Sequence, residues 1–173
     1  MSEGEVETVW LDAESKVADA PADHRSELRL WLRLLTCSTL IETEVRRRLR
    51  EDYDFTLPRF DLLAQLDRAP DGLVLGEVSK RLMVSAGNVT AIAERLLESG
   101  HITRAASPND RRIQIIRMTP FGRKAFREMA EAHGGWIGTL FADLQPQEID
   151  MLMQGLARLK ASVRKGIDEG AHA

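Results

Sequence analysis

Small polar side chains beside a run of basic residues are the groups in this sequence whose types and spacing could do chemistry. Asn88, Thr90 and Ala91 lie on the predicted outer face of a helix. Between positions 100 and 130, seven basic residues face two acidic ones, a local charge of +5. Asparagine and threonine can hydrogen-bond to base edges or phosphate, and alanine can touch a thymine methyl group. The pattern predicts contact with double-stranded DNA rather than catalysis.

The total charge of the chain hides this basic region. The net charge of the 173 residues is −3, which taken alone argues against a nucleic-acid binder. The first 23 residues hold seven acidic residues and one basic residue, a balance of −6, so residues 24–173 carry +3. An acidic arm therefore masks a basic remainder, and the distribution of charge matters more than its sum.

Residue types that other functions need are scarce or scattered. The single cysteine, Cys37, excludes an internal disulfide, and the four histidines lack a carboxylate cluster at ligand spacing, so neither a metal nor a cofactor is predicted. No nucleophile–base pair or phosphate-binding glycine loop is recognisable, so an enzyme built around His133 and Trp136 is not predicted. No apolar run approaches the roughly 18 residues of a membrane span. The acidic start is unlike a secretory signal, so we expect a cytoplasmic protein.

Two short helices and a β-hairpin must position the candidate DNA-binding side chains. Apolar and β-branched spacing predicts helices at 75–82 and 86–98, followed by strands at 101–104 and 113–118. Ser85 is placed to cap the second helix, and residues 107–110 are typical turn residues. The arrangement is that of a winged helix-turn-helix, whose second helix enters a major groove while its arginine-rich hairpin tip suits a minor groove.

Long helices are predicted on both sides of this block. They are expected at about 26–50, from Thr56 to a stop at Pro70, from Thr119 to about Leu144, and from Pro146 onward. The apolar stripe of the last helix is what a helical dimer interface requires. The predicted fold is mainly α with a small β-hairpin wing. The predicted domains are an acidic N-terminal arm (1–23), an N-terminal dimerisation helix (24–56), a winged helix-turn-helix DNA-binding domain (57–127) and C-terminal dimerisation helices (128–173).

Each of these features also has a plainer explanation. A solvated helix face would carry the same residues at 86–98, and charged loop residues are mostly exposed in any protein. A winged-helix module that binds another protein instead of DNA is a further alternative. Salt dependence separates the two kinds of partner, because phosphate contacts make DNA affinity fall steeply with added salt.

Several short segments match a known family pattern. They are Leu75-Gly76-Glu77-Val78-Ser79-Lys80-Arg81-Leu82, Ser85-Ala86-Gly87-Asn88-Val89-Thr90, Arg95-Leu96-Leu97, Gly100-His101-Ile102, Asp110-Arg111-Arg112 and Met118-Thr119-Pro120-Phe121-Gly122-Arg123. Together they resemble the MarR family of bacterial transcriptional regulators, and the motif match covers about residues 57–127. The Asp-x-Arg wing followed by Thr-Pro-x-Gly is the specific part of this resemblance.

The resemblance implies a homodimeric repressor that binds a pseudo-palindromic operator. It makes 86–98 the recognition helix and Asp110 with Arg112 the wing-tip pair. The predicted DNA-binding residues are Ser85, Asn88, Thr90, Ala91, Arg95, Asp110, Arg111 and Arg112. Two positions depart from the pattern: Ala91 stands where many relatives place arginine, and Met118 replaces the commoner leucine, a mild core exchange.

The resemblance also implies a switch, either a small ligand bound between the dimer helices and the DNA-binding lobe or oxidation of a cysteine. The candidate effector-binding residues are Trp31, Phe60, His133 and Trp136, for which ordinary core packing is the alternative. Segment 87–90, together with Ala132-His133 and Trp136-Ile137, is similar to the branch that regulates hydroxycinnamate and related aromatic catabolism, which implies an aromatic acid or a hydroxycinnamoyl-CoA thioester. Cys37 is expected to be a buried structural cysteine, with a thiol-based redox sensor as the alternative.

Overall fold

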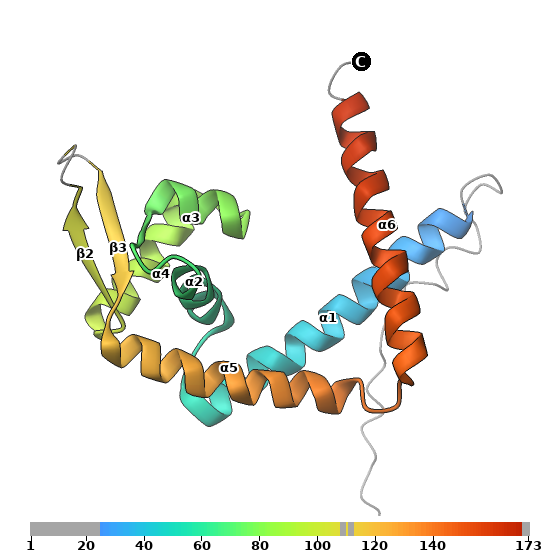
Figure 1. The fold of residues 1–173 in the computed structure, drawn as a ribbon, viewed down its shortest axis with the longest axis horizontal. Helices are drawn as coiled ribbons and strands as arrows, with labels where there is room; N and C mark the ends of the chain where they lie inside the picture. Colours follow the sequence, from blue (N-terminus) through green and yellow to red (C-terminus); the bar gives the residue numbers. More distant parts are fainter. Residues whose placement is uncertain (1–24, 108–109, 111–112, 171–173) are drawn as a thin grey trace, which may run out of the picture. The chain divides into compact units, whose positions relative to one another are not determined.

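The computed structural model describes residues 25–107, 110 and 113–170 (Figure 1). Its elements are α1 (Arg25–Tyr53), α2 (Leu57–Asp67), β1 (Leu73–Val74), α3 (Leu75–Leu82), α4 (Ala86–Glu98), β2 (Ile102–Ala106), β3 (Gln114–Met118), α5 (Pro120–Leu140) and α6 (Pro146–Gly170). The predicted fold class, mainly helical with a small β-hairpin wing, is confirmed. The described residues form two compact units, one up to residue 132 and one from residue 133 onward. No helix within the described ranges is long and apolar enough to cross a membrane.

A tight turn joins α1 to α2. Asp54 adopts a left-handed backbone conformation with φ of +47°, and the next residue, Phe55, is buried. Helix α2 then begins with Pro58 in its first turn, as the sequence predicts, because proline lacks only an N–H that would have no partner there. The Thr56 hydroxyl does not cap the helix but accepts a hydrogen bond from Arg59 Nε at 3.2 Å. The turn thereby fixes the start of α2 against the end of α1.

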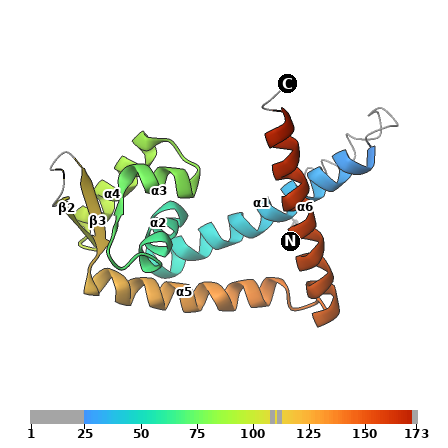
Figure 2. The ribbon, with the colours of Figure 1, turned by 45° about the horizontal axis from the view of Figure 1, so that its top comes forward.

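Helices α2, α3 and α4 pack against one another and form most of the core of the first unit (Figure 2). The predicted bounds of α3 and α4 are confirmed at both ends. The side chains that are almost fully buried come from all three helices and from β3; they are Leu62, Leu63, Leu66, Val78, Val89, Leu96 and Ile116. Burial at this spacing leaves the opposite face of α4 free for another partner.

The sheet has the strand order β1-β3-β2, with both pairs antiparallel. The predicted hairpin is confirmed as β2 and β3, whereas β1, which pairs Leu73 with Ile116 and Val74 with Ile115, is absent from the sequence-based prediction. Gly72 precedes β1 with φ of +89°, and a Cβ atom there would lie 2.5 Å from the Ile116 carbonyl oxygen. Only glycine allows β1 to approach β3 this closely.

The start of α5 is held against the start of β2. The Thr119 hydroxyl donates to the Gly100 carbonyl at 2.8 Å and accepts from the Gly122 N–H at 2.9 Å, so it also caps the helix. The Thr119 N–H donates to the His101 carbonyl at 3.0 Å. A Cβ atom on Gly122 would lie 2.0 Å from the His101 carbonyl oxygen, so the threonine and glycine of the Thr-Pro-x-Gly segment have a packing role.

The second unit contains the end of α5 and all of α6. Helix α5 ends at Leu140, four residues before the predicted end, and α6 begins at Pro146 as predicted. The Gln145 N–H donates to the Glu148 carboxylate at 2.8 Å, which closes the first turn of α6. Trp136 is buried, whereas α6 has no buried side chain along its whole length.

The prediction that Cys37 is buried is wrong for the single chain, in which this thiol is exposed. The physical reason is the position of Cys37 along α1. From residue 26 onward, the first buried side chain of α1 is Val45, so the N-terminal half of the helix has no core to enter. Helical spacing indicated an apolar stripe there but did not say what covers it.

We predict that the Gly122→Ala substitution lowers the free energy of unfolding by about 3 kcal/mol, because the added methyl group would collide with a backbone carbonyl that cannot rotate away. Chemical denaturation measures the change. Gly76→Ala is the matched control: a Cβ there meets nothing within 4 Å, and alanine favours a helix by up to about 1 kcal/mol over glycine. Equal stability of the two variants would contradict the prediction.

Candidate nucleic-acid interface

The N-terminal half of α4 presents an exposed surface of small and polar residues. Ser85 caps the helix, since its side chain accepts a hydrogen bond from the Asn88 N–H at 3.3 Å. Val89, Ala93 and Leu96 are buried on the inner face of the helix. The exposed residues on the outer side are Ala86, Gly87, Asn88, Thr90 and Ala91. Small side chains such as these permit close approach of the helix to a groove.

The hydrogen-bonding groups on this surface are not equally available. The Thr90 hydroxyl donates to the Ala86 carbonyl at 2.9 Å, so its proton is already used within the helix. The Ser85 hydroxyl oxygen is occupied by the cap. The Asn88 side-chain amide, in contrast, has no hydrogen-bond partner among the described residues. Asn88 is therefore the side chain best able to read a base edge.

Arg95 lies farther along α4, in a different setting from Asn88. With Ala91, Glu94 and Arg59 it lines an open groove of about 700 Å³. Burial, together with the positive charge of Arg95, lowers the pKa of Arg59, and the charge of Asp54 partly offsets this effect. The groove is also lined by Glu98, so its two guanidinium groups face two carboxylates and its charge is mixed.

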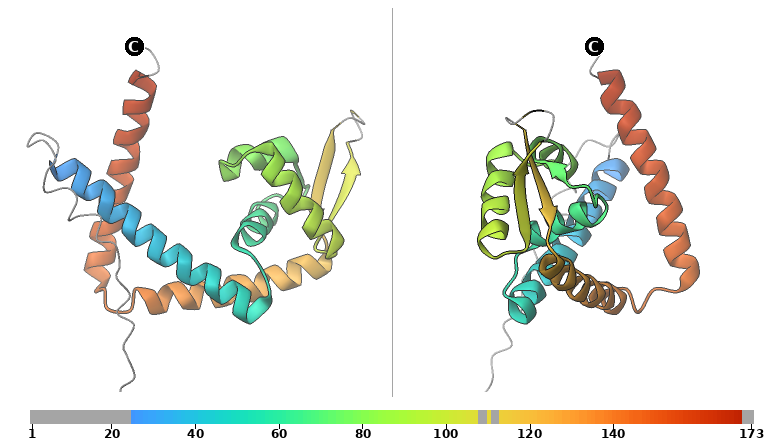
Figure 3. Two further views of the ribbon diagram at one scale, coloured as in Figure 1. Left: turned by 180° about the vertical axis from the view of Figure 1, so that it is seen from behind. Right: turned by 60° about the vertical axis from the view of Figure 1, so that its left-hand side comes forward.

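The wing consists of β2 and β3, which project from the helices as a two-stranded ribbon (Figure 3). At its tip, the Ser107 N–H donates to the Ile113 carbonyl at 2.8 Å and the Ile113 N–H donates to the Asp110 carbonyl at 2.9 Å. Asp110 is half-exposed. The predicted contact residues Arg111 and Arg112 lie outside the described residues.

Several basic residues of this region are already paired with carboxylates. Arg104 on β2 forms an ion pair with Glu94 on α4, and Arg123 lies 3.3 Å from Asp67. Lys124 lies 4.0 Å from a Glu128 oxygen within α5. The local charge of +5 counted along the sequence therefore overstates the charge available to DNA, because sequence counting cannot see that Glu94 and Asp67 fold against these arginines.

Met83, in the turn between α3 and α4, is a residue that the sequence reasoning missed. Its backbone is left-handed, with φ of +53° and ψ of +39°, and its side chain is 91% exposed. A non-glycine residue in this conformation costs about 1 kcal/mol. The break at this position was predicted, but the residue type carries no signal of a left-handed backbone, which asparagine or glycine would have given.

An aromatic column connects the α1–α2 turn with the start of α5. The Arg59 guanidinium lies 4.3 Å from the centre of the Phe55 ring. The Phe55 and His101 ring centres are 5.3 Å apart, and those of His101 and Phe121 are 4.9 Å apart. The column lines a pocket of about 440 Å³. Because His101 lies between the end of α4 and the start of β2, the column joins the recognition helix to α1 and α5.

The candidate effector residues fall into different surroundings. Phe60 is buried in the first unit, where its ring centre lies 5.4 Å from that of Phe126. Trp31 on α1 is 57% exposed. In the second unit, His133 and Trp136 contact edge to face, with ring centres 6.3 Å apart, and burial lowers the pKa of His133. His133 and Trp136 are thus brought together as the helical spacing suggests.

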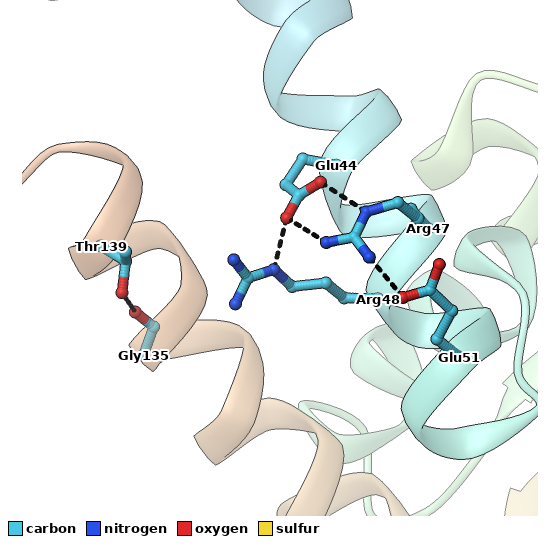
Figure 4. Close-up of polar contacts among 6 residues, drawn as sticks. All are labelled: Glu44, Arg47, Arg48, Glu51, Gly135 and Thr139. Carbon is cyan, nitrogen blue, oxygen red and sulfur yellow. Dashed lines mark hydrogen bonds and ion pairs between the residues drawn. The ribbon is translucent and has the colours of Figure 1, made fainter. Parts of the chain in front are cut away.

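Charged side chains also cluster on α1 (Figure 4). Hydrogen bonds from Arg47 and Arg48 lower the pKa of Glu44 from its ordinary 4.5 to about 2. Arg47 also pairs with Glu51. The spacings are those of helix-stabilising pairs, so this cluster supports the helix rather than binding a ligand. Among the described residues, no group of three or more histidine, cysteine or acidic side chains could hold a metal ion.

The three-helix core, the capped α4 with its exposed face and the β2–β3 wing define a winged helix-turn-helix DNA-binding transcriptional regulator. Residues 53–113 match the family model described as MarR family. The DNA-binding region of the chain thus matches the MarR family, as the sequence resemblance predicted.

Individual relatives and solved structures are similar to this chain over most of its length. The transcriptional activatory protein BadR from Rhodopseudomonas palustris is 26% identical over 165 residues, covering 92% of this chain and 93% of BadR. A MarR family regulator from Silicibacter pomeroyi is 28% identical, with a TM-score of 0.72 and coverage of 83% of this chain and 99% of that one. FabT from Streptococcus pneumoniae, solved in complex with DNA, is 24% identical, with a TM-score of 0.68 and coverage of 80% and 98%.

We predict that acidification weakens the fold through His101. Burial and the positive charge of Arg59 lower the pKa of this ring below its ordinary 6.5, although Ser99 partly opposes the shift. The unfolded chain therefore takes up the proton first, and stability is lost as the pH falls through about 6.5. Nuclear magnetic resonance titration should place the His101 midpoint below 6.5.

The His101→Phe variant keeps a ring in the column but removes this titration. Its free energy of unfolding should vary less between about pH 7.5 and pH 5.5 than that of the original protein. Phe121→Leu is the control, since it alters the same column without removing a titrating ring. A His101 midpoint at or above 6.5 would contradict the prediction.

Proposed function

We propose that this protein is a homodimeric, ligand-responsive repressor that binds a pseudo-palindromic operator. The observation that carries the proposal is the Asn88 amide, exposed and without a partner among the described side chains, in the first turn of α4. In a helix-turn-helix, the N-terminal residues of the second helix meet the base edges. The residues proposed to contact DNA are Ser85, Asn88, Thr90, Ala91, Arg95, Asp110, Arg111 and Arg112.

Dimerisation is proposed for the helices at 24–56 and 128–173, which flank the DNA-binding domain at 57–127. Helix α6 supports this proposal, since its exposed apolar residues include Ile149, Leu152, Leu156, Val163 and Ile167, which recur at helical spacing. A stripe of this kind is uncommon on a monomer, and a second copy of the same helix is the simplest cover. A dimer would present two α4 helices about one DNA turn apart.

Repression is the proposed outcome of operator binding. The relative BadR is named a transcriptional activatory protein, and this name favours an activator as the second candidate. Both candidates use the same DNA-binding surface and differ only in where the operator lies relative to the promoter. The proposed location is the cytoplasm, where the regulator would meet DNA.

The proposed effector is an aromatic acid or its CoA thioester, of the hydroxycinnamoyl kind. The aromatic side chains available to such a ligand include the exposed Trp31 and the His133–Trp136 pair. The assignment of Trp31, Phe60, His133 and Trp136 to the effector stays a prediction from the sequence. The exposure of Cys37 keeps thiol oxidation as the alternative trigger, because an accessible thiol can react.

We predict that Asn88→Ala weakens binding to a selected operator duplex about tenfold, because alanine cannot hydrogen-bond to the base edge that the amide would read. The affinity of the original protein should fall at least about tenfold between about 50 and 200 mM salt, since phosphate contacts release counterions. Gel-shift titration measures both effects. Gln147→Ala, which removes an amide from the exposed start of α6, is the control. Binding that does not depend on the salt concentration would favour the alternative of a winged-helix module that binds another protein.

We predict that a hydroxycinnamoyl-CoA thioester, or the free acid, releases the protein from its operator. Fluorescence anisotropy of a labelled duplex measures the release, with CoA alone as the control ligand. Trp31→Ala should weaken the response to the ligand more than it weakens DNA binding, because Trp31 lies on α1, outside the proposed DNA-binding domain. Release by neither the acids nor the thioesters would overturn this choice of ligand.

A further inference from the structure

We propose that the recognition surface reads A·T base pairs and that Met83 contributes by packing against thymine methyl groups. The inference rests on the proposed DNA-binding function and adds the base preference of that same surface. The inference follows from the left-handed backbone of Met83, from the position of the Met83 side chain and from the residue types around it.

The first observation is that nothing in the fold accounts for methionine at position 83. Its φ of +53° lies in the left-handed region, which glycine enters freely and a side chain with a Cβ resists. Its side chain, 91% exposed, is the most exposed large hydrophobic side chain in the described part of the chain. The left-handed turn closes α3, since the Val84 N–H donates to the Ser79 carbonyl at 3.2 Å, but neither backbone nor packing favours methionine over glycine at this position. A strained backbone that carries an almost fully exposed apolar side chain points to a function.

The second observation is the place of Met83 next to the recognition helix. It lies two residues before the cap residue Ser85, at the end of α4 that meets base edges in a helix-turn-helix. Val84, Ala86 and Ala91 are also exposed, so this end of the helix has an apolar character. In the major groove, the thymine methyl group is the apolar feature of the base edges.

The third observation is the composition of the surface. Residues 83–91 contain neither arginine nor lysine, the side chains that most often read guanine. The Asn88 amide suits the paired donor and acceptor of adenine, whereas the Thr90 proton is taken by the Ala86 carbonyl. An unbranched thioether is long and adaptable enough to follow the floor of a groove. Amide and apolar groups together match an A·T pair better than a G·C pair.

The test compares two duplexes. The first is enriched from a randomised library by the original protein, and the second is the same duplex with deoxyuridine in place of thymidine, which removes the methyl groups alone. Met83→Gly deletes the side chain and relieves the backbone, whereas Met83→Leu keeps an apolar side chain. Asp54→Gly is the matched control, because Asp54 is the other non-glycine residue with positive φ in the described part of the chain.

We expect the enriched duplexes to be rich in A·T pairs at the half-sites. The original protein should bind the uridine duplex about fourfold more weakly for each thymine methyl group that Met83 would cover. Met83→Gly should show a smaller thymidine preference, because only the smaller apolar side chains such as Ala91 then remain to contact methyl groups, and Met83→Leu should keep a preference for thymidine. Asp54→Gly should bind like the original protein. Both glycine variants should melt a few degrees higher, which would show that weaker binding does not come from a damaged fold.

Two results would overturn the inference while leaving the proposed function intact. One is a Met83→Gly variant that keeps the full thymidine preference, and the other is enrichment of half-sites rich in G·C pairs. Failure of the original protein to enrich any duplex would overturn the proposed function and this inference with it.

Discussion

The constraint on which the DNA-binding unit depends is the close approach of the start of α5 to the start of β2. Gly122 lies against the His101 carbonyl with no room for a Cβ atom, and the Thr119 hydroxyl joins the Gly100 carbonyl to the Gly122 N–H. Because Gly100 follows α4, this contact fixes where the recognition helix ends. The His101 ring also contacts the Phe55 ring, so the same region packs against the turn at the end of α1. The orientation of α4 is thus set by backbone contacts at its far end.

The charged side chains of this unit contribute to the fold as well as to the proposed binding of DNA. The Arg104–Glu94 pair joins the wing to α4, and Arg123 joins α5 to α2 through Asp67. These pairs are partly exposed, so each contributes little stability, but each fixes the direction of a long side chain. Because these arginines are paired with carboxylates, the positive potential of this surface is smaller than the sequence suggests. The proposed affinity for DNA therefore depends more on the recognition helix and the wing tip than on total charge.

The sequence predicted the elements whose signals are local. The ends of α4 follow from a serine cap and a glycine stop, and the hairpin follows from alternating apolar residues around turn residues. Features that depend on distant partners were missed. Strand β1 is two residues long and exists only as a partner of β3, and the Arg104–Glu94 pair joins two elements. The exposure of Cys37 depends on what covers α1, and the left-handed backbone of Met83 depends on how α3 meets α4. The residues assigned to DNA contact and to the effector remain predictions.

Helix α6 has 25 residues and buries no side chain in the single chain. Such a helix lacks the main source of helical stability in proteins, which is packing of an apolar face. If a second copy supplies that packing, the order of the second unit is a property of the assembled pair, and folding becomes a second-order process in protein concentration. Dilution would then separate the two copies and unfold α6 in a single equilibrium. The concentration of the regulator in the cell would determine what fraction of it is folded.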